Sequence, residues 1–468
     1  MGNLLSRLKT LYFGLEYLLD LNKTLNHVLT RASAPPGLPV PNPTPSYWLE
    51  DPPFPDLVHL QSPTLPSRAD IVIIGSGITG AAVARSILQE CLRKGQTRQI
   101  VVLEARTLCS GATGRNRGHM KASPQELFAD MRGRHGEERA AATTRFQLVH
   151  VGVLTRLCRQ EGWEAVERRE VTTADLFLDD EGREKRMEEV EELRRWVPEL
   201  RMDVLGAEEA REKFGVNDYV QGAISYPTGA LWPYRLVSSA WNDLLTKFLK
   251  SISLEMVTPV LSIYPSSTEG YAYEVVTTRG TIHCDHVVHA TNAFASHVLG
   301  HMTAQHPGTR FPNFDGRLSW SVIYEKAYDY VTQRPMTTYG MPGDIMLGGG
   351  FNRGRDQGLD HIGRWDDSQP RWGDDREGWR VKKAWVGCIA FTGDGMPFVG
   401  RLDPELTGWR PGRKSTGNGV EPGDEREDLP DAPGRLPGKV VDWFPAELKP
   451  SLERVKRADL SNLVKYAP

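Results

Sequence analysis

Cysteine, long apolar stretches and any excess of basic residues are all scarce in this chain of 468 residues. Its five cysteines are odd in number and lack the spacing of a metal site, which favours free thiols in a reducing, cytoplasmic compartment. No run of about eighteen apolar residues occurs, so the sequence predicts no membrane-spanning helix. The formal net charge of -3 argues against a nucleic-acid surface, which is built from clustered lysine and arginine.

A Gly-x-Ser-x-Gly elbow and a cluster of His, Cys and Asp with metal-ligand spacing are also missing from the sequence. Hydrolysis by a serine nucleophile or by a bound metal ion therefore has no support. With 39% hydrophobic and 25% charged residues, the chain is expected to be globular and long enough for two packed units.

Residues 1–34 carry leucines three and four positions apart, with charged residues between them, which predicts an amphipathic helix. The opening six residues, from Met1 to Ser6, also fit the pattern for N-myristoylation. Two interpretations stay open: the helix docks on the body of the protein, or residues 1–29 bind peripherally to a membrane.

Residues 35–69 are rich in proline, which prevents a persistent helix or central strand and predicts an extended arm. Large apolar side chains within the arm would anchor it to the protein surface, because an aromatic residue contributes stability only when it is buried. The expected anchors are Trp48, Leu49, Phe54, Leu57 and Val58.

A glycine-rich turn follows the β-branched residues 70–74, which read as a buried parallel strand. Gly75, Gly77 and Gly80 have the spacing Gly-x-Gly-x-x-Gly, and a helix pattern follows from residue 81. This arrangement predicts a tight turn, close approach of the backbone to a pyrophosphate, and close packing of helix on strand. A second strand, residues 100–103, ends at Glu104, where a carboxylate accepts hydrogen bonds from a ribose. The alternative is an ordinary strand-turn-helix with incidental glycines.

Residues 110–119, with the sequence Ser-Gly-Ala-Thr-Gly-Arg-Asn-Arg-Gly-His, distinguish between dinucleotides. Here the chain resembles the FAD-dependent D-amino-acid oxidase (DAO) superfamily, in particular its glycine oxidase-like and fungal amine oxidase-like branch. In that family this segment wraps the pyrophosphate and reaches the isoalloxazine ring. The resemblance implies FAD as cofactor and an α/β fold, in which a Rossmann-like FAD-binding domain carries a smaller α+β substrate domain built on an antiparallel sheet.

Two later segments extend the resemblance. Residues 284–295 resemble the family's second nucleotide-side signature, although a plain strand-to-helix turn is the alternative, and residues 385–400 resemble its return to the flavin domain. The cofactor-binding residues expected from the glycine turn and the resemblance are Gly75, Ser76, Gly77, Ile78, Thr79, Gly80, Glu104, Ala105, Arg106, Ser110, Gly111, Ala112, Thr113, Arg115, Asn116, Gly118, His119, Val260, Ala290, Thr291, Asn292, Asp394 and Gly395.

The resemblance also divides the chain into domains. The FAD-binding domain is expected to be discontinuous, with residues 70–165, 225–315 and 381–468, and the substrate domain to comprise residues 166–224 and 316–380. Relatives follow the segment matching residues 395–400 with a glycine-rich turn and a long apolar helix that faces the flavin. Residues 403–437 instead are rich in Gly, Pro, Asp and Arg. We therefore expect this stretch to be disordered and FAD binding to be weakened.

The activity implied by the resemblance is oxidation of a C–N bond in a small amine or amino acid, with hydride transfer to flavin N5 and hydrolysis of the imine. Three residues are catalytic candidates: His119 beside the flavin segment, Arg117 as a partner for a substrate carboxylate, and Tyr324 as a pocket wall together with Tyr328 and Tyr330. A structural histidine, a surface ion pair and sheet packing are the respective alternatives. The alternative functions are a catalytically impaired flavoprotein or a flavin-free scaffold descended from such an oxidase, and an NAD-dependent dehydrogenase.

Overall fold

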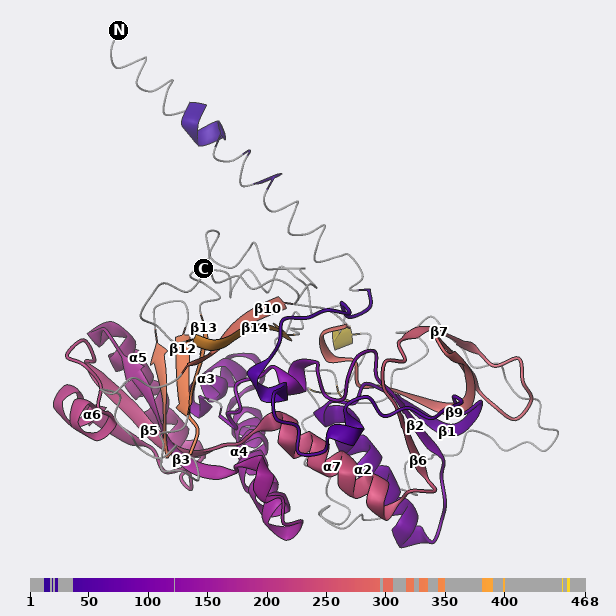
Figure 1. Cartoon of the computed structure of the whole chain (residues 1–468). Coiled ribbons are helices and arrows are strands. Elements are labelled where there is room, and N and C mark those ends of the chain that lie inside the picture. Colours follow the sequence, from indigo (N-terminus) through magenta and orange to yellow (C-terminus); the bar gives the residue numbers. More distant parts are fainter. Residues whose placement is uncertain are drawn as a thin grey trace.

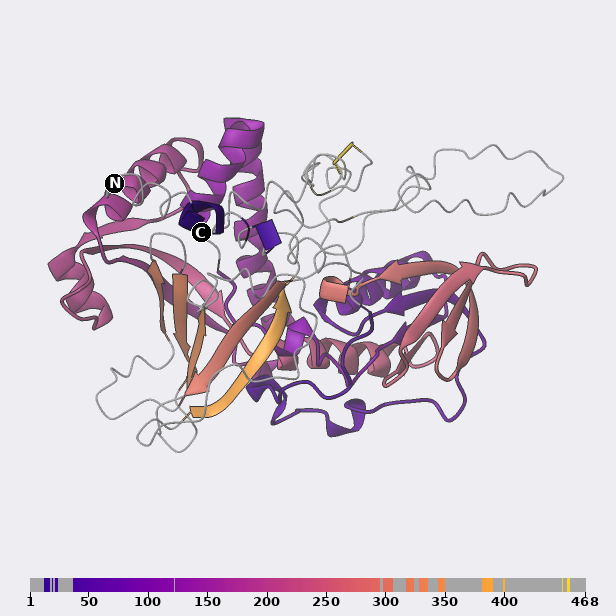
Figure 2. The same ribbon diagram turned by 90° about the horizontal axis from the view of Figure 1, so that it is seen from above.

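The computed structural model describes residues 12–16, 19, 22–23, 37–121, 123–294, 298–305, 317–323, 328–335, 344–349, 381–389, 399, 448 and 453–454. Two sheets dominate these residues and lie at opposite ends of the body, as the view from above in Figure 2 shows. In the part of the chain that the structure describes, no helix is both long and apolar enough to cross a membrane.

The first sheet has six strands in the order β6-β2-β1-β9-β8-β7 (Figure 1). Their bounds are Arg68–Ile74 for β1, Ile100–Leu103 for β2, Ile252–Glu255 for β6, Val260–Pro265 for β7, Tyr273–Thr277 for β8 and Gly280–His289 for β9. The first four in this order run parallel, and β8 and β7 are added as antiparallel strands. Residues 284–289, the first part of the segment of residues 284–295, form the end of β9, which lies beside β1.

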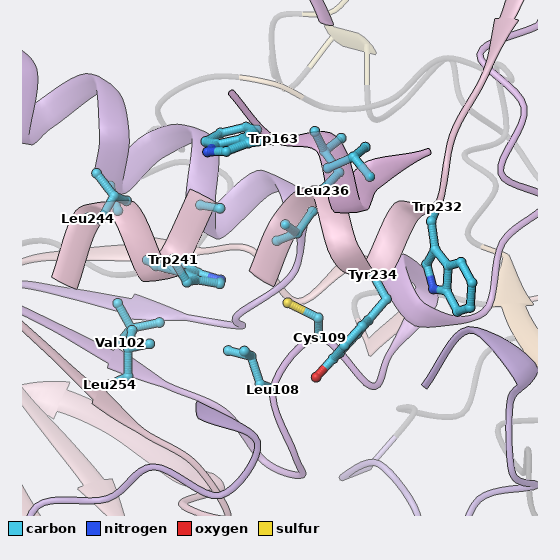
Figure 3. Packing of buried hydrophobic residues seen from close by; sticks show 14 of the residues in the cluster. Val102, Leu108, Cys109, Trp163, Trp232, Tyr234, Leu236, Trp241, Leu244 and Leu254 are labelled. Carbon is cyan, nitrogen blue, oxygen red and sulfur yellow. The ribbon is translucent and has the colours of Figure 1, made fainter. Parts of the chain in front are cut away.

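Two helices, α2 (Ile78–Lys94) and α7 (Pro233–Lys247), pack against this sheet (Figure 1). Trp241 and Leu244 of α7 lie over Val102 of β2 and Leu254 of β6, as Figure 3 shows. All four side chains are buried. Apolar burial stabilises by roughly 25 cal/mol per Å², and Ala81, Ala84 and Leu88 of α2 are buried in the same cluster, which holds α2 against the sheet.

The second sheet has eight strands in the order β14-β10-β13-β12-β11-β3-β5-β4. Its strands are β3 (Arg169–Phe177), β4 (Asp203–Gly206), β5 (Gly222–Ala230), β10 (Val298–Gln305), β11 (Leu318–Ile323), β12 (Tyr328–Gln333), β13 (Ile345–Gly349) and β14 (Val381–Ile389). All neighbours are antiparallel except β11 and β3, which are parallel.

Helices α3 (Pro124–His135), α4 (Glu137–Gln160) and α5 (Asp180–Trp196) pack on the second sheet, where Phe128 and Leu193 meet Phe177 and Tyr226. The shorter α6 (Ala207–Phe214) packs on it in a separate cluster through Phe214. Short 3₁₀ turns complete the described elements: η1 (Tyr47–Leu49), η2 (Pro55–Leu57), η3 (Ala112–Gly114), η4 (Glu164–Val166) and η5 (Asn292–Phe294).

Sheet membership differs from the expected domain division at three strands. The expectation placed residues 225–315 and 381–468 with the nucleotide-binding unit, yet β5, β10 and β14 all belong to the eight-stranded sheet. The physical reason is hydrogen bonding: β10 pairs along its whole length with β14 and β13, and β5 pairs with β3 and β4. Within the expected substrate domain, β11 and β12 pair with each other.

The proline-rich arm docks through its aromatic residues. Trp48, one of the expected anchors, is buried, and Leu49 and Leu57 pack partly buried against the same core. Tyr47, which was not expected as an anchor, is also buried, and its ring stacks on Trp232 with centroids 5.7 Å apart. The arm is therefore part of the main hydrophobic core.

Candidate dinucleotide site

The glycine turn between β1 and α2 has the conformation that its spacing predicts. Gly75 has φ of +112°, and a Cβ atom there would lie 2.5 Å from the carbonyl oxygen of Ala290. A Cβ atom on Gly80 would collide with the carbonyl oxygen of Gly75. A side chain at either position would thus push the turn away from β9 or lift the helix from the turn.

Gly77 is the N-cap residue of α2 and has no side chain to cap the helix. A Cβ atom there would meet Thr113 Oγ1 at 3.0 Å, and that oxygen accepts a hydrogen bond of 2.9 Å from the Ile78 N–H. Thr113 belongs to the segment of residues 110–119, so this bond fastens the segment to the helix N-terminus. Backbone N–H groups and the helix dipole favour an anion at such a position.

The Glu104 carboxylate at the end of β2 supports the turn as well as facing the cavity. Its Oε2 accepts hydrogen bonds from the Ser76 N–H at 3.0 Å and from the Ser76 hydroxyl at 2.7 Å, and its Oε1 accepts from the Arg106 N–H at 3.1 Å. A carboxylate has about four lone-pair positions, so these three bonds leave capacity for a ligand hydroxyl.

Ser76 is fully buried and connects three elements. Its hydroxyl accepts from the Cys109 N–H at 2.8 Å while donating to Glu104, and its carbonyl oxygen accepts from Trp241 Nε1 of α7 at 2.7 Å. Burial and the nearby Glu104 carboxylate raise the pKa of the Cys109 thiol well above its ordinary value, so this cysteine stays protonated and structural.

The segment of residues 110–119 is held largely by its own side chains. Arg115 is fully buried, and its guanidinium donates to the Ser110 carbonyl at 2.9 Å and to the Thr44 carbonyl and hydroxyl oxygens. The Asn116 amide donates to the Thr113 carbonyl at 3.0 Å and accepts from the Gly118 N–H at 2.8 Å. In contrast, the buried Ser110 Oγ has no hydrogen-bond partner among the described residues.

These elements surround a cavity of about 540 Å³. Sixteen of the residues expected to bind the cofactor line it: Gly75, Gly77, Ile78, Thr79, Glu104, Ala105, Arg106, Gly111, Ala112, Thr113, Arg115, Asn116, Val260, Ala290, Thr291 and Asn292. Ser76, Gly80, Ser110, Gly118 and His119 are not in this lining, and Ser76 and Gly80 support the turn from behind. The volume is in the range of cofactor pockets.

Several lining residues were not expected. They are Gly37, Leu38 and Pro39 from the arm, Ile74, Leu103, Thr258, Leu261, Ser262 and Ile263 from the six-stranded sheet and its turns, and His289 and Phe294 near the end of β9. Burial lowers the pKa of His289 below its ordinary value. His289 directly precedes the Ala-Thr-Asn signature, so its position in sequence was a usable signal, whereas the arm residues had none.

A second group of side chains lies where the segment of residues 110–119 reaches the eight-stranded sheet. The Arg117 guanidinium stacks on the Tyr330 ring of β12, 3.7 Å from its centroid, and the His119 ring lies 6.3 Å from the same ring. His119 forms an isolated bridge with Ala230 of β5, and its shielded Nε2 has no hydrogen-bond partner among the described residues. Burial, reinforced by Lys121, Arg117 and Arg169, lowers the pKa of His119 well below its ordinary value, so the ring is neutral at pH 7.

Next to this group, Lys121 and Asp175 form a buried ion pair with Nζ and Oδ1 2.6 Å apart. The Asp175 carboxylate also accepts from Tyr226 and Gln125, and Lys121 donates to Ser321 of β11 at 2.7 Å. A buried charge pair with all these partners fixes the strands relative to the segment of residues 110–119. The remaining expected site residues, Tyr324, Asp394 and Gly395, lie outside the described residues. In the described ranges, no group of three or more His, Cys, Asp or Glu side chains is placed to hold a metal ion.

Comparison with known proteins agrees with this geometry. The family model DAO, described as FAD dependent oxidoreductase, matches residues 70–413. The chain belongs to this family. It is therefore an FAD-dependent oxidoreductase, as the resemblance at residues 110–119 predicted, and the nicotinamide alternative is set aside. No curated protein matches the chain in sequence.

Solved structures of similar fold include L-proline dehydrogenase from P. horikoshii, with a TM-score of 0.50 and 20% identity over 73% of this chain and 86% of that chain. L-amino acid deaminase from Proteus myxofaciens in complex with anthranilate has a TM-score of 0.50 and 13% identity, covering 78% and 87%. Glycine oxidase from Geobacillus kaustophilus has a TM-score of 0.49 and 18% identity, covering 73% and 88%. The first two likenesses confirm the α/β fold with a Rossmann-like FAD-binding domain.

Proposed function

We propose that this oxidoreductase binds FAD in the cavity beside the glycine turn and oxidises the C–N bond of a small amine or amino acid. The family and the enzyme class stand on the match over residues 70–413. The narrower proposal is supported by the two solved structures at a TM-score of 0.50, whose names state that they act on L-proline and on L-amino acids.

The residues present fit FAD. The Gly75–Gly77–Gly80 turn leaves no side chain between the backbone and a pyrophosphate, and the Glu104 carboxylate has acceptor capacity for ribose hydroxyls. The Gly111, Ala112 and Thr113 backbone of the segment of residues 110–119 lines the same cavity, so a pyrophosphate placed beside the turn would also lie against this segment. Glu104 would also repel the 2′-phosphate of NADP.

Bound in the cavity, FAD would supply a hydride acceptor for the carbon that bears the nitrogen, and the imine so formed would be hydrolysed in water. The chain supplies binding, orientation and exclusion of water. Arg117 is held flat against Tyr330 and presents a planar cation that suits a carboxylate. The His119 ring is neutral, and its shielded Nε2 has no hydrogen-bond partner among the described residues; a bound substrate group would supply that partner. Burial lowers the pKa of His119 and makes it a weak proton acceptor, so we assign it to orienting a substrate group.

The observation that carries this proposal is the position of Arg117 and His119. Both lie at the end of the segment of residues 110–119, after the residues of this segment that line the cavity, and both lie near Tyr330 of the eight-stranded sheet. Hydride transfer requires cofactor and substrate to be held next to each other, and a substrate pocket between the nucleotide-binding unit and the eight-stranded sheet would provide this.

Anaerobic mixing of the purified flavoprotein with a panel of amino acids and amines tests the proposal. Bleaching of the visible flavin band by at least one carboxylate-bearing amine, with formation of the corresponding oxo acid and ammonia, is the expected result. The matched control is Gly77→Val, whose side chain meets Thr113 and blocks the turn; this variant is expected to be colourless. Stoichiometric FAD in Gly77→Val would place the flavin elsewhere.

A second candidate function keeps the fold and the FAD site but with slow turnover. It is favoured by the composition of residues 403–437, which lacks the apolar helix that relatives have there; these residues lie outside the described residues. Loss of one set of helix N–H donors costs a few kcal/mol by analogy with oxyanion sites. If the second candidate is right, insertion of a relative's strand and helix between Arg401 and Val440 should raise FAD occupancy. If the first is right, the unmodified chain is already fully occupied and the insertion should not change its occupancy.

A further inference from the structure

The arm runs along the segment of residues 110–119 and is tied to it at successive positions. The Arg106 guanidinium donates to the Val40 carbonyl at 3.3 Å, and Arg115 donates to the Thr44 carbonyl at 2.6 Å. Further along, the Ser46 hydroxyl donates to the Gly114 carbonyl at 2.5 Å, and Trp48 Nε1 donates to the Asn116 carbonyl. The two stretches therefore lie side by side, from residue 40 of the arm to residue 48.

Close packing accompanies these hydrogen bonds. A Cβ atom on Gly114 would lie 2.7 Å from Leu49 Cδ2, and one on Gly118 would lie 3.1 Å from the Trp48 ring. Both glycines thus leave the space that the arm fills. The arm is also bonded to the start of α7, because Nε1 of its N-cap residue Trp232 donates to the Trp48 carbonyl at 2.7 Å.

The start of the described arm forms part of the wall of the cavity itself. Gly37, Leu38 and Pro39 line it together with Glu104 and Arg106. The Leu38 side chain is 48% exposed, so it offers apolar surface that a ligand in the cavity would cover. The family model begins at residue 70, so Gly37, Leu38 and Pro39 lie outside the matched part of the chain.

We propose that residues 37–40 are a part of the FAD site and retain the bound cofactor. This inference rests on the proposal that the cavity holds FAD. Leu38 and Pro39 cover the ligand beside Glu104, and the bond from Arg106 to Val40 holds them there. Because Arg106 follows Glu104 by two residues, the wall closes over the same end of the cavity at which the carboxylate meets a ribose.

The physical effect of such a wall is on cofactor release. FAD leaving the cavity has to uncover Leu38 and Pro39, which costs free energy in proportion to the apolar area exposed. Proline at residue 39 also limits the freedom of the wall when the cavity is empty, so little conformational entropy is lost on binding. Differences in affinity among related complexes arise mostly in dissociation rates.

Two truncated chains test the inference. One begins at Pro35 and keeps residues 37–40, and the other begins at Pro41 and lacks them, while both keep the docked residues from Thr44 to Leu49. We expect the shorter chain to release FAD about tenfold faster, as measured by the rise in fluorescence when flavin leaves the protein. Equal release rates for the two chains would overturn the inference.

A point variant in the intact chain decides the matter if the shorter chain does not fold. Leu38→Ser removes the apolar face and should speed FAD release by about fivefold, whereas Leu249→Ser, at a leucine 75% exposed and absent from the cavity wall, should not change it. If Leu38→Ser and Leu249→Ser release FAD alike, residues 37–40 have no part in retention.

The Gly77→Val variant separates the two proposals. If it loses FAD while the Leu38 variant and both truncations retain it equally, the cavity is the FAD site and the role of the arm alone is overturned. If Gly77→Val keeps stoichiometric FAD, the location of the FAD site is wrong and the role of the arm is overturned with it.

Discussion

The guanidinium carbon of Arg117 lies 3.7 Å from the centroid of the Tyr330 ring. This stack joins the end of the cofactor segment to β12, the strand that contributes a buried tyrosine to the junction between the two units. An arginine held in this way keeps its planar face on the ring, and the N–H groups along the edge of a guanidinium are the donors that match a planar anion.

Arg117→Met should impair amino acids more than amines without a carboxylate. Loss of a charge-assisted hydrogen bond costs about 1.5–3 kcal/mol, so KM for the amino acid is expected to rise about tenfold to a hundredfold. Steady-state kinetics with an amino acid and the matching decarboxylated amine measure the difference. Arg117→Lys is the control that keeps the charge but loses the stack on Tyr330. Its KM for the amino acid should lie between the values for wild type and Arg117→Met. Equal effects on both substrates would contradict a role in carboxylate binding.

His119→Gln should reduce the dependence of stability on pH. The pKa of His119 in the folded protein is well below the unfolded value of 6.5, so the unfolded chain binds more protons as the pH falls. The wild-type contribution from this group is therefore complete above pH 6.5 and is lost progressively as the pH falls below 6.5 towards the folded pKa. Thermal unfolding at pH 7.5 and pH 5.5 should show a larger drop for wild type than for the variant. Parallel profiles would show that His119 is accessible to protons in the folded state.

Glu104→Gln should destabilise the protein even without FAD. The two carboxylate oxygens of Glu104 accept three hydrogen bonds from Ser76 and Arg106. In glutamine one of these oxygens becomes an NH₂ group, which donates and cannot accept, so the bonds to Ser76 or the bond to Arg106 are lost. An unsatisfied buried partner costs about 1–3 kcal/mol. Denaturant unfolding of the apoprotein measures this loss, and FAD titration measures the effect on binding. Weaker FAD binding with unchanged apoprotein stability would mean that the carboxylate acts on the ribose alone.

Removal of residues 1–34 should abolish binding to anionic lipid vesicles and leave FAD binding intact. The described residues Tyr12, Phe13, Leu15 and Leu19 are all more than half exposed, and they supply apolar surface for a membrane interface. Cosedimentation of the intact and truncated chains with vesicles of phosphatidylserine and phosphatidylcholine is the measurement. If neither chain binds, peripheral membrane association through residues 1–29 is wrong.

Local sequence patterns predicted the glycine turn and the position of Glu104, because both depend on the backbone conformation of neighbouring residues. The glycine spacing fixes the turn at Gly75 through its φ angle, and Glu104 follows the next strand at the same edge of the sheet. Arg115 was expected to contact the cofactor; it lines the cavity, but its guanidinium is engaged by Ser110 and Thr44. Sequence spacing does not reveal which long-range partner an arginine finds.

The arm and the sheet boundaries depend on tertiary contacts and were outside the reach of local patterns. Leu38 reaches the cavity only because Arg106 and Arg115 bind the arm more than sixty residues earlier in the chain. The strand β5 contains Pro227 and Gly229, residues that favour turns over strands, and its pairing with β3 and β4 overrides that local preference. Strand identity in such a case is decided by neighbours distant in sequence.

The place of β9 beside β1 has a consequence for the order of events on the ribosome. Arg68 at the start of β1 is aligned with His283 in β9, and Ala290, which closes over Gly75, follows that strand directly. While β1, the glycine turn and β2 are synthesised early, their central partner emerges only after much of the second unit. Pairing across so long an intervening chain is slow, because the loop entropy is lost before the strand contacts form. The nascent chain therefore cannot capture its cofactor stably until translation has passed residue 290.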